Sequence, residues 1–125
     1  PALLICVHRL SPACAAIEAN GRFCVNLLRA DQADISDTFA GRRKTENGDK
    51  FGCARWRRLA TGAPALDDAL VTFDCTLMRQ LEWGTHAIFI ADVVDVEVAE
   101  AGQPLVYANR GYAISLPALA AAATH

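Results

Sequence analysis

A histidine stands where the sequence enters a long apolar segment, and its side chain is the first candidate for chemistry. His86 follows Gly84 and Thr85, and every second residue after it shares one face of the extended segment 86–98. Apart from Asp92, the other residues on this face are apolar: Ile88, Ile90, Val94, Val96 and Val98. Two interpretations stay open. The imidazole caps the end of a strand, or it faces a ligand at the mouth of a barrel.

Two other segments could contact a negatively charged ligand. Arg9 and Ser11 directly precede Pro12, where a helix is predicted to begin, and the N-terminus of a helix favours anions. Seven of the chain's twelve Lys and Arg residues lie within positions 42–58: Arg42, Arg43, Lys44, Lys50, Arg55, Arg57 and Arg58. This stretch predicts either attraction of anionic nucleotides or a solvated loop that offsets the acidic remainder of the chain.

The composition describes a globular domain with a surplus of apolar residues. The chain has 125 residues, of which 53% are hydrophobic and 21% charged, and its mean hydropathy is +0.18. A domain of this length buries roughly two thirds of its unfolded surface. We therefore expect one domain, residues 1–125, with part of its apolar surface in a subunit interface.

The charge and the hydrophobic runs disfavour two classes of partner. The net charge of −2 gives no argument for nucleic acid or for a membrane surface. The sequence shows no signal peptide and no apolar run of about 18 residues, the length that a membrane span needs. Five cysteines are scattered without a CxxC pair, and the three histidines lie far apart in the sequence. We expect free thiols, a cytoplasmic protein and no metal site.

The elements that would hold the candidate residues begin with two strands and a helix. Residues 2–7 are all apolar and predict a strand buried on both faces. Ser11 and Pro12 begin a helix that Gly21 ends. A second strand follows at residues 23–28.

A second short helix and a long loop are expected next. Asp31 is predicted to cap the helix and Gly41 to end it. The basic residues 42–58 show little periodicity and contain an Asn-Gly pair, which predicts a loop. Loops of this length inside a compact domain are often functional.

The rest of the chain predicts antiparallel strands. Residues 71–78 alternate between two faces, the odd-numbered ones facing inward, and are expected to pair with residues 86–98. Residues 105–107 and 112–114 flank a turn at residues 109–111.

Together the elements predict a mainly β fold, an antiparallel barrel or half-barrel with two short helices. An OB-fold competes on composition, and it would make the basic loop a nucleic-acid contact. The basic stretch has a single tryptophan and no ladder of aromatic residues for base stacking, which disfavours this alternative.

The order of the motifs resembles the flavin reductase domain family, which is built on the FMN-binding split barrel. Matching segments run along nearly the whole chain: residues 1–7, Ser11, residues 21–28, Phe39-Ala40-Gly41, residues 61–66, Phe73-Asp74-Cys75, residues 86–93 and residues 105–112. The resemblance implies an antiparallel Greek-key split β-barrel. Relatives carry a further segment before the position of Pro1, so we expect this chain to be N-terminally incomplete.

Three positions depart from the family pattern. His8 stands where asparagine is common, Leu10 where serine is common, and Ala91 where glycine is usual. The first two bear on contacts close to the flavin.

The resemblance implies roles for ten residues. His86 would position the nicotinamide or the flavin edge and would not act as a base, because hydride transfer needs two rings stacked about 3–3.5 Å apart and little covalent help. The other nine would contact the flavin: His8, Arg9, Ser11, Phe39, Ala40, Gly41, Arg42, Arg110 and Tyr112. Tyr107 would help to close the site.

The resemblance further implies an NAD(P)H-dependent flavin reductase that transfers a hydride from NADH or NADPH to FMN or FAD. We expect a homodimer that supplies reduced flavin to a partner flavin-dependent monooxygenase. Two alternatives stay open: an FMN-dependent reductase of another acceptor, such as a corrinoid cobalt centre, and a non-catalytic barrel that binds flavin or a partner.

Overall fold

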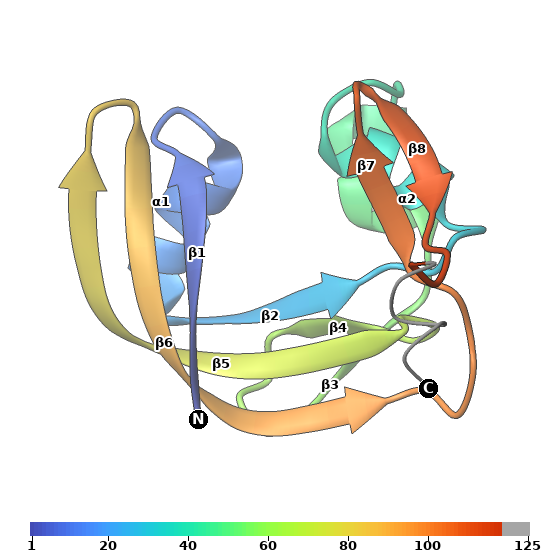
Figure 1. The fold of residues 1–125 in the computed structure, drawn as a ribbon. Coiled ribbons are helices and arrows are strands. Elements are labelled where there is room, and N and C mark those ends of the chain that lie inside the picture. The colour runs from blue at the N-terminus through green and yellow to red at the C-terminus, as the bar shows by residue number, and fades with distance from the viewer. Residues whose placement is uncertain (119–125) are drawn as a thin grey trace.

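The computed structural model describes residues 1–118, and its fold is organised around one long hairpin (Figure 1). Strands β5 (Val71–Trp83) and β6 (His86–Val98) run antiparallel and are joined by a tight turn in which Gly84 has a φ of 59°. β1 (Ala2–His8) pairs with β6, and β2 (Arg22–Leu27) pairs with β5. The sheet has the order β1-β6-β5-β2, and all of its neighbouring strands are antiparallel, as the sequence predicts.

Two irregularities bend this hairpin. The register between β5 and β6 shifts between Asp74 and Cys75 and again between Leu77 and Arg79. Bulges of this kind increase the local twist of a strand pair. The sheet therefore rises along the left of Figure 1 and then crosses beneath the molecule, which gives the mainly β half-barrel that the sequence predicts.

Helix α1 (Pro12–Asn20) connects the two edge strands of the sheet. Ser11 is its N-cap and accepts a hydrogen bond from the backbone N–H of Ala13 at 3.3 Å. Gly21 ends the helix with a φ of 67°. The predicted helix and both of its end signals are confirmed.

The main core lies between α1 and the upright part of the sheet. Its buried members come from the helix and from three strands: Cys14, Ile17, Phe23, Cys75, Ala87, Phe89 and Ala91. On β6 the buried face is thus the one that carries Phe89. His86 begins the opposite face, which α1 does not cover.

β1 differs from the prediction because one of its two faces is uncovered. Leu3, Ile5 and Val7 pack against the core, whereas Leu4 is 57% exposed. A continuous apolar run is typical of a strand buried on both faces. Here β1 is an edge strand, and α1 covers it from one side.

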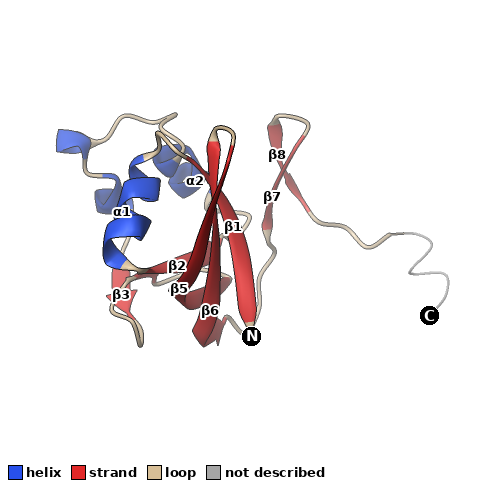
Figure 2. Cartoon of the chain, turned by 90° about the vertical axis from the view of Figure 1, so that its left-hand side faces the viewer, coloured by secondary structure: helices blue, strands red, loops and turns tan. Residues whose placement is uncertain are grey.

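A second group of elements stands across from this core. Helix α2 (Ala33–Phe39) is followed by two short 3-10 helices, η1 (Glu46–Gly48) and η2 (Lys50–Cys53). The hairpin of β7 (Leu105–Ala108) and β8 (Gly111–Ile114) lies beside α2 (Figure 1). In Figure 2 this hairpin stands apart from the sheet, on the side opposite α1.

The predicted capping of α2 by Asp31 is wrong. The N-cap position is Gln32, and its side chain makes no capping bond. That side chain instead accepts the backbone N–H of Arg29 at 2.8 Å and donates to the carbonyl of Asp68 at 3.0 Å. Gln32 therefore ties the start of α2 to the loop that precedes β5. Gly41 ends the region of α2 with a φ of 78°, as predicted.

The prediction of a loop over residues 42–58 is also wrong. Besides η1 and η2, this segment contains β3 (Trp56–Arg58), which pairs with β4 (Pro64–Leu66). The Asp49 side chain begins η2 by accepting the backbone N–H of Phe51 at 3.0 Å. These are short elements held by capping and by tertiary pairing, which leave no periodic pattern in the sequence.

The even-numbered face of β5 is not the solvent face that the sequence predicts. Asp74 is fully buried, and it accepts the backbone N–H of Thr61 at 2.8 Å and the Thr61 hydroxyl at 2.6 Å. Thr72 is 2% exposed and donates to Asn26 Oδ1, which also accepts the backbone N–H of Leu66. The face is buried at these two residues, where β4 lies against β5, whereas Met78 farther along it is exposed.

Among the described residues, no helix combines the length and the apolar character that crossing a bilayer would need.

Candidate functional site

Four of the predicted site residues gather at one corner, where β1 ends and β6 begins. His8 lies directly opposite His86 in the ladder, and their rings pack edge to face with centroids 5.2 Å apart. Arg9 and Ser11 follow His8 in the turn that leads into α1. We call these four residues the histidine corner.

Hydrogen bonds to residues nearby in the chain hold both imidazoles of the histidine corner. The backbone N–H of Leu10 donates to Nδ1 of His8 at 3.1 Å. A backbone N–H can only donate, so in this arrangement Nδ1 carries no proton and the proton of neutral His8 is on Nε2. His86 Nδ1 lies 2.9 Å from the hydroxyl of Thr85. When that hydroxyl donates, Nε2 of His86 is likewise left as a donor for a ligand.

Arg9 joins the two turns at this corner. Its backbone N–H donates to the carbonyl of Thr85 at 2.9 Å, and its Nη1 donates to the carbonyl of Gly84 at 3.3 Å. Nη2 lies 3.8 Å from Glu82 Oε2, and the arginine side chain remains about half exposed. Arg9 thus keeps part of its guanidinium accessible, while the Ser11 hydroxyl caps α1.

The remaining predicted residues lie on the opposite side of the molecule, and two of them contact each other. Arg42 donates to the hydroxyls of Tyr107 and Tyr112, each at 3.3 Å, and its Nε lies 3.2 Å from Asp37 Oδ1. The Tyr112 hydroxyl donates to the same oxygen of Asp37 at 2.5 Å. We call these four residues the Arg42 cluster. It fastens the β7–β8 hairpin to α2.

The bonds within the Arg42 cluster also affect its charge. The hydrogen bond to Tyr107 raises the pKa of Arg42 above its ordinary value, and Asp37 adds to this effect. The guanidinium therefore keeps its positive charge beside the Tyr107–Tyr112 pair, close to the hairpin turn. Sequence reasoning missed Asp37, because its partner Tyr112 lies 75 positions away in the chain and Asp37 sits in an ordinary helix.

Arg110 occupies the tip of the β7–β8 hairpin and is exposed. Asn109 and Arg110 form the two-residue turn with φ values of 53° and 62°. Hairpin turns with two left-handed residues favour asparagine and glycine, so arginine is an unusual occupant of the second position. A residue that keeps an unfavourable backbone conformation at an exposed tip is a candidate for function.

The segment Phe39-Ala40-Gly41 closes α2 and carries an aromatic cluster. The ring of Phe39 packs edge to face against Phe51 and Trp56, with centroids 5.3 Å and 5.6 Å away. Phe51 and Trp56 escaped the sequence prediction. Their only signal was that they interrupt a basic stretch with aromatic residues.

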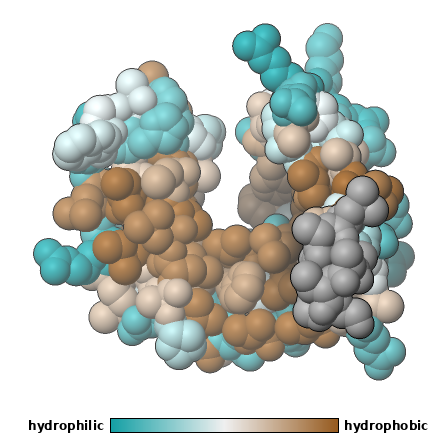
Figure 3. All heavy atoms as spheres, in the orientation of Figure 1, coloured by the Kyte–Doolittle hydropathy of each residue, from teal (hydrophilic) through white to brown (hydrophobic). Residues whose placement is uncertain are grey.

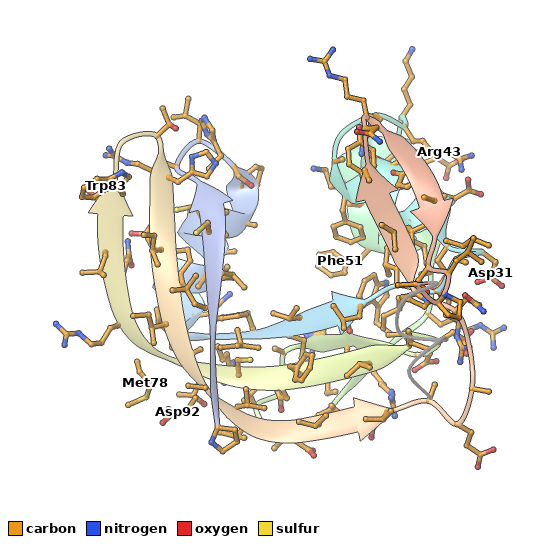
Figure 4. All side chains as sticks on the ribbon, in the orientation of Figure 1. Asp31, Arg43, Phe51, Met78, Trp83 and Asp92 are labelled. Carbon is orange, nitrogen blue, oxygen red and sulfur yellow. The ribbon has the colours of Figure 1, made fainter. Side chains whose placement is uncertain are left out.

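The two groups of residues face each other across a hollow. Figure 3 shows a deep notch between two lobes, with apolar side chains along the left lobe and the floor. The left lobe carries the histidine corner, and the right lobe carries α2, the β7–β8 hairpin and the aromatic cluster. In Figure 4 the ring of Phe51 points into this hollow, whereas Arg43 and Asp31 point away from it. The structure thus places all ten predicted residues on its two lobes.

A separate cleft of about 660 Å³ lies between α2 and residues 43–53, and its charges do not suit a phosphate. Arg43 and Lys44 line it, together with the carboxylates of Asp34, Glu46 and Asp49. Arg43 is moreover paired with Asp34 at 2.8 Å. The acids outnumber the cations, so this cleft gives no support to the attraction of anionic nucleotides by Arg43 and Lys44.

Within residues 1–118, no three side chains of His, Cys, Asp or Glu converge as ligands of a metal ion.

Known proteins are similar to this chain in sequence and in fold. Residues 1–115 match the model of the family described as Flavin reductase like domain. A protein named FMN reductase (NADH) RutF 2, from Rhizobium rhizogenes, is 44% identical over 112 residues, which cover 90% of this chain and 64% of the relative. The chain therefore spans less than two thirds of that relative's length.

Two solved structures have the same fold. A nitrilotriacetate monooxygenase component B homologue from Mycobacterium thermoresistibile is 31% identical, with a TM-score of 0.83 over 94% of this chain and 68% of the other. BorF, the flavin reductase component of a bacterial two-component tryptophan halogenase, is 30% identical, with a TM-score of 0.81 over 91% of this chain and 72% of the other.

Proposed function

The chain belongs to the flavin reductase like domain family, and from this membership we propose that it is an NADH-dependent FMN reductase. NADH, FMN and one proton give NAD⁺ and reduced FMN, with the hydride passing between two stacked rings. The observation that carries the proposal is the hollow with the histidine corner on one lobe and the aromatic cluster on the other. We propose residues 1–125 as one domain of this kind.

The side chains at the hollow fit a planar, anionic ligand. The two imidazoles present Nε2 as donors toward ring carbonyls or an amide, and an aromatic ring faces them across an apolar floor. Catalysis then consists of positioning, because hydride transfer requires two rings at about 3–3.5 Å and no protein base. Arg9 offers a half-exposed cation to the phosphate, beside the N-terminus of α1.

Within this proposal, the predicted residues of the right lobe divide into two roles. Arg42 and Tyr112 hold the β7–β8 hairpin against α2, and the hairpin carries Arg110 at its tip. Phe39 supports the aromatic cluster, while Ala40 and Gly41 end α2 and so set the position of Arg42.

We propose that two copies form a homodimer and that the dimer supplies reduced flavin to a monooxygenase. What supports the dimer is a set of large apolar side chains of the sheet that are exposed in one copy: Leu4, Met78, Leu81, Val94, Val96 and Val98. What supports the monooxygenase partner is the name of one structural relative, the nitrilotriacetate monooxygenase component B homologue. Free thiols at all five cysteines suit a reducing compartment, and we place the protein in the cytoplasm.

The activity is tested with the intact protein by following NADH oxidation at 340 nm, the nicotinamide absorption band, with and without added FMN. We expect oxidation that depends on flavin, with FMN preferred over FAD and NADH over NADPH. Failure to oxidise either nicotinamide with any flavin would refute the reductase. Light scattering during gel filtration tests the dimer, and Leu4→Arg is expected to convert it to a monomer.

A further inference from the structure

Three aromatic side chains on the right lobe form a closed cluster. The rings of Phe39, Phe51 and Trp56 all pack edge to face, with centroids between 5.0 Å and 5.6 Å apart. Such pairs prefer this geometry, and each adds to the stability of the arrangement. The three rings therefore fix one another's orientation.

Phe51 is held from its backbone as well. Its N–H donates to Asp49 Oδ1 at 3.0 Å, and its carbonyl accepts the indole N–H of Trp56 at 2.8 Å. The residue nevertheless remains 47% exposed, and its ring points into the hollow between the lobes (Figure 4). A fixed aromatic ring that stays in contact with water presents a ready surface for another flat ring.

We propose that Phe51 binds the planar heteroaromatic ring of the nucleotide in the hollow, the isoalloxazine of FMN or the nicotinamide of NADH, by stacking. This inference rests on the proposed function and adds to it a residue that no predicted motif contained. Phe39 and Trp56 brace Phe51 from behind, and the histidine corner supplies polar contacts from the other lobe. A ring stacked on Phe51 would thus lie in the hollow, with the histidine corner on the lobe across from it.

The experiment measures equilibrium binding of riboflavin, FMN and NADH to the intact protein and to Phe51→Leu and Phe51→Tyr. Riboflavin lacks the phosphate and so isolates the ring. Loss of one aromatic stacking partner corresponds to a weakening of roughly 5- to 100-fold. We expect Phe51→Leu to weaken riboflavin and FMN by the same factor, and Phe51→Tyr to stay within about twofold of the native protein.

Each outcome has one meaning. Equal weakening of riboflavin and FMN identifies the flavin ring as the partner, and weakening of NADH alone identifies the nicotinamide. Unchanged affinity of Phe51→Leu for all three overturns the inference. Binding of flavin by the native protein without any turnover refutes the reductase but leaves the stacking contact open to the same measurement.

A further variant guards against a folding defect in Phe51→Leu. Phe51→Trp keeps a flat aromatic ring at this position, so we expect it to retain FMN binding that Phe51→Leu loses. Weakening by Phe51→Trp as large as that by Phe51→Leu, in a protein with a native melting temperature, would also overturn the inference.

Discussion

His8 is the last residue of β1 and His86 is the first residue of β6. The two lie opposite each other, with ring centroids 5.2 Å apart and an interplanar angle of 71°. Neither ring belongs to the core, and both are exposed. Because Nδ1 of each ring is engaged by a local partner, the two Nε2 atoms are the groups left for a ligand. The pair therefore presents two Nε2 atoms at one wall of the hollow, and that of His8 is a donor.

Replacing His86 tests this arrangement. We expect His86→Ala to raise the Michaelis constant for NADH or FMN by about tenfold, which corresponds to the loss of one hydrogen bond to a bound ligand. The melting temperature should stay close to that of the native protein, because the side chain is exposed. A large drop in melting temperature with an unchanged Michaelis constant would assign His86 a purely structural role.

The Arg42 cluster predicts a coupling between the hairpin and the site. Tyr112→Phe removes the hydroxyl that joins Asp37 and Arg42, and we expect it to lower the free energy of unfolding by about 1 kcal/mol. Hydrogen exchange should show faster opening of β7 and β8 than of β5 and β6. Tyr107→Phe is the matched control, since Tyr107 contacts Arg42 but makes no bond to Asp37 among the described contacts. An equal effect of both variants would contradict a special role for the bond to Asp37.

The tip of the hairpin offers a test in which stability and binding move in opposite directions. Arg110 has a φ of 62°, a conformation that glycine adopts without strain. We expect Arg110→Gly to raise the free energy of unfolding by about 0.5 kcal/mol or to leave it unchanged, and to weaken nucleotide binding. Denaturant unfolding and FMN titration measure the two effects. Unaltered affinity would remove Arg110 from the binding residues.

Asp74 is expected to be the most sensitive polar residue for folding. Asp74→Ala removes the buried carboxylate that accepts both the backbone N–H and the hydroxyl of Thr61, at a cost of about 2–3 kcal/mol. Thr61→Val removes the hydroxyl bond alone and should cost about 1 kcal/mol. Equal losses in the two variants, measured by urea unfolding, would show that the backbone bond contributes nothing.

The thiols should fall into two classes of reactivity. Burial, aided by the charge of Asp74, raises the pKa of Cys24 to about 12 and the pKa of Cys75 to about 11. At pH 8 both are protonated and should resist alkylation, whereas Cys53 is exposed and should react with iodoacetamide. Mass spectrometry of the alkylated native protein checks this pattern, and modification of Cys75 at a rate similar to Cys53 would contradict it.

The same shifts fix a direction for stability at high pH. Because folding raises these two thiol pKa values above the ordinary 9.0, the unfolded chain loses its thiol protons first as the pH increases. Stability from this source is complete below about pH 9 and declines above it.

Cys6 is also exposed in one copy, and its protection from alkylation in the dimer would support the proposed interface.

Local signals in the sequence were sufficient for much of the fold. Ser11, Pro12 and Gly21 mark the ends of α1 because capping and a left-handed stop depend on a few adjacent residues. The β5–β6 pairing was equally predictable, since the alternation of apolar and polar residues and the tight turn lie within one stretch of chain. The exposure of one face of β1 could not be predicted, because an apolar sequence is the same whether one or both faces of the strand are covered.

The candidate site shows the same division. The family resemblance named ten residues, which the structure divides between two lobes, but it could not tell that Arg42 and Tyr112 contact each other. The hydrogen bond between Tyr112 and Asp37 joins residues 75 positions apart, so no local pattern announces it. A role for Phe51 could not be predicted for a related reason. Its ring becomes a candidate for ligand binding only because Phe39 and Trp56 pack against it in the folded chain.

The order of the strands has a consequence for how the protein is made. β1 leaves the ribosome well before β6, yet the two strands pair, and Ala2 lies opposite Asp92. At about 5–20 residues per second, the apolar strand β1 waits for several seconds before its partner has been synthesised. The β5–β6 hairpin can form on its own within microseconds. β1 thus stays without its strand partner until β6 has been made, and its pairing with the finished hairpin completes this edge of the sheet.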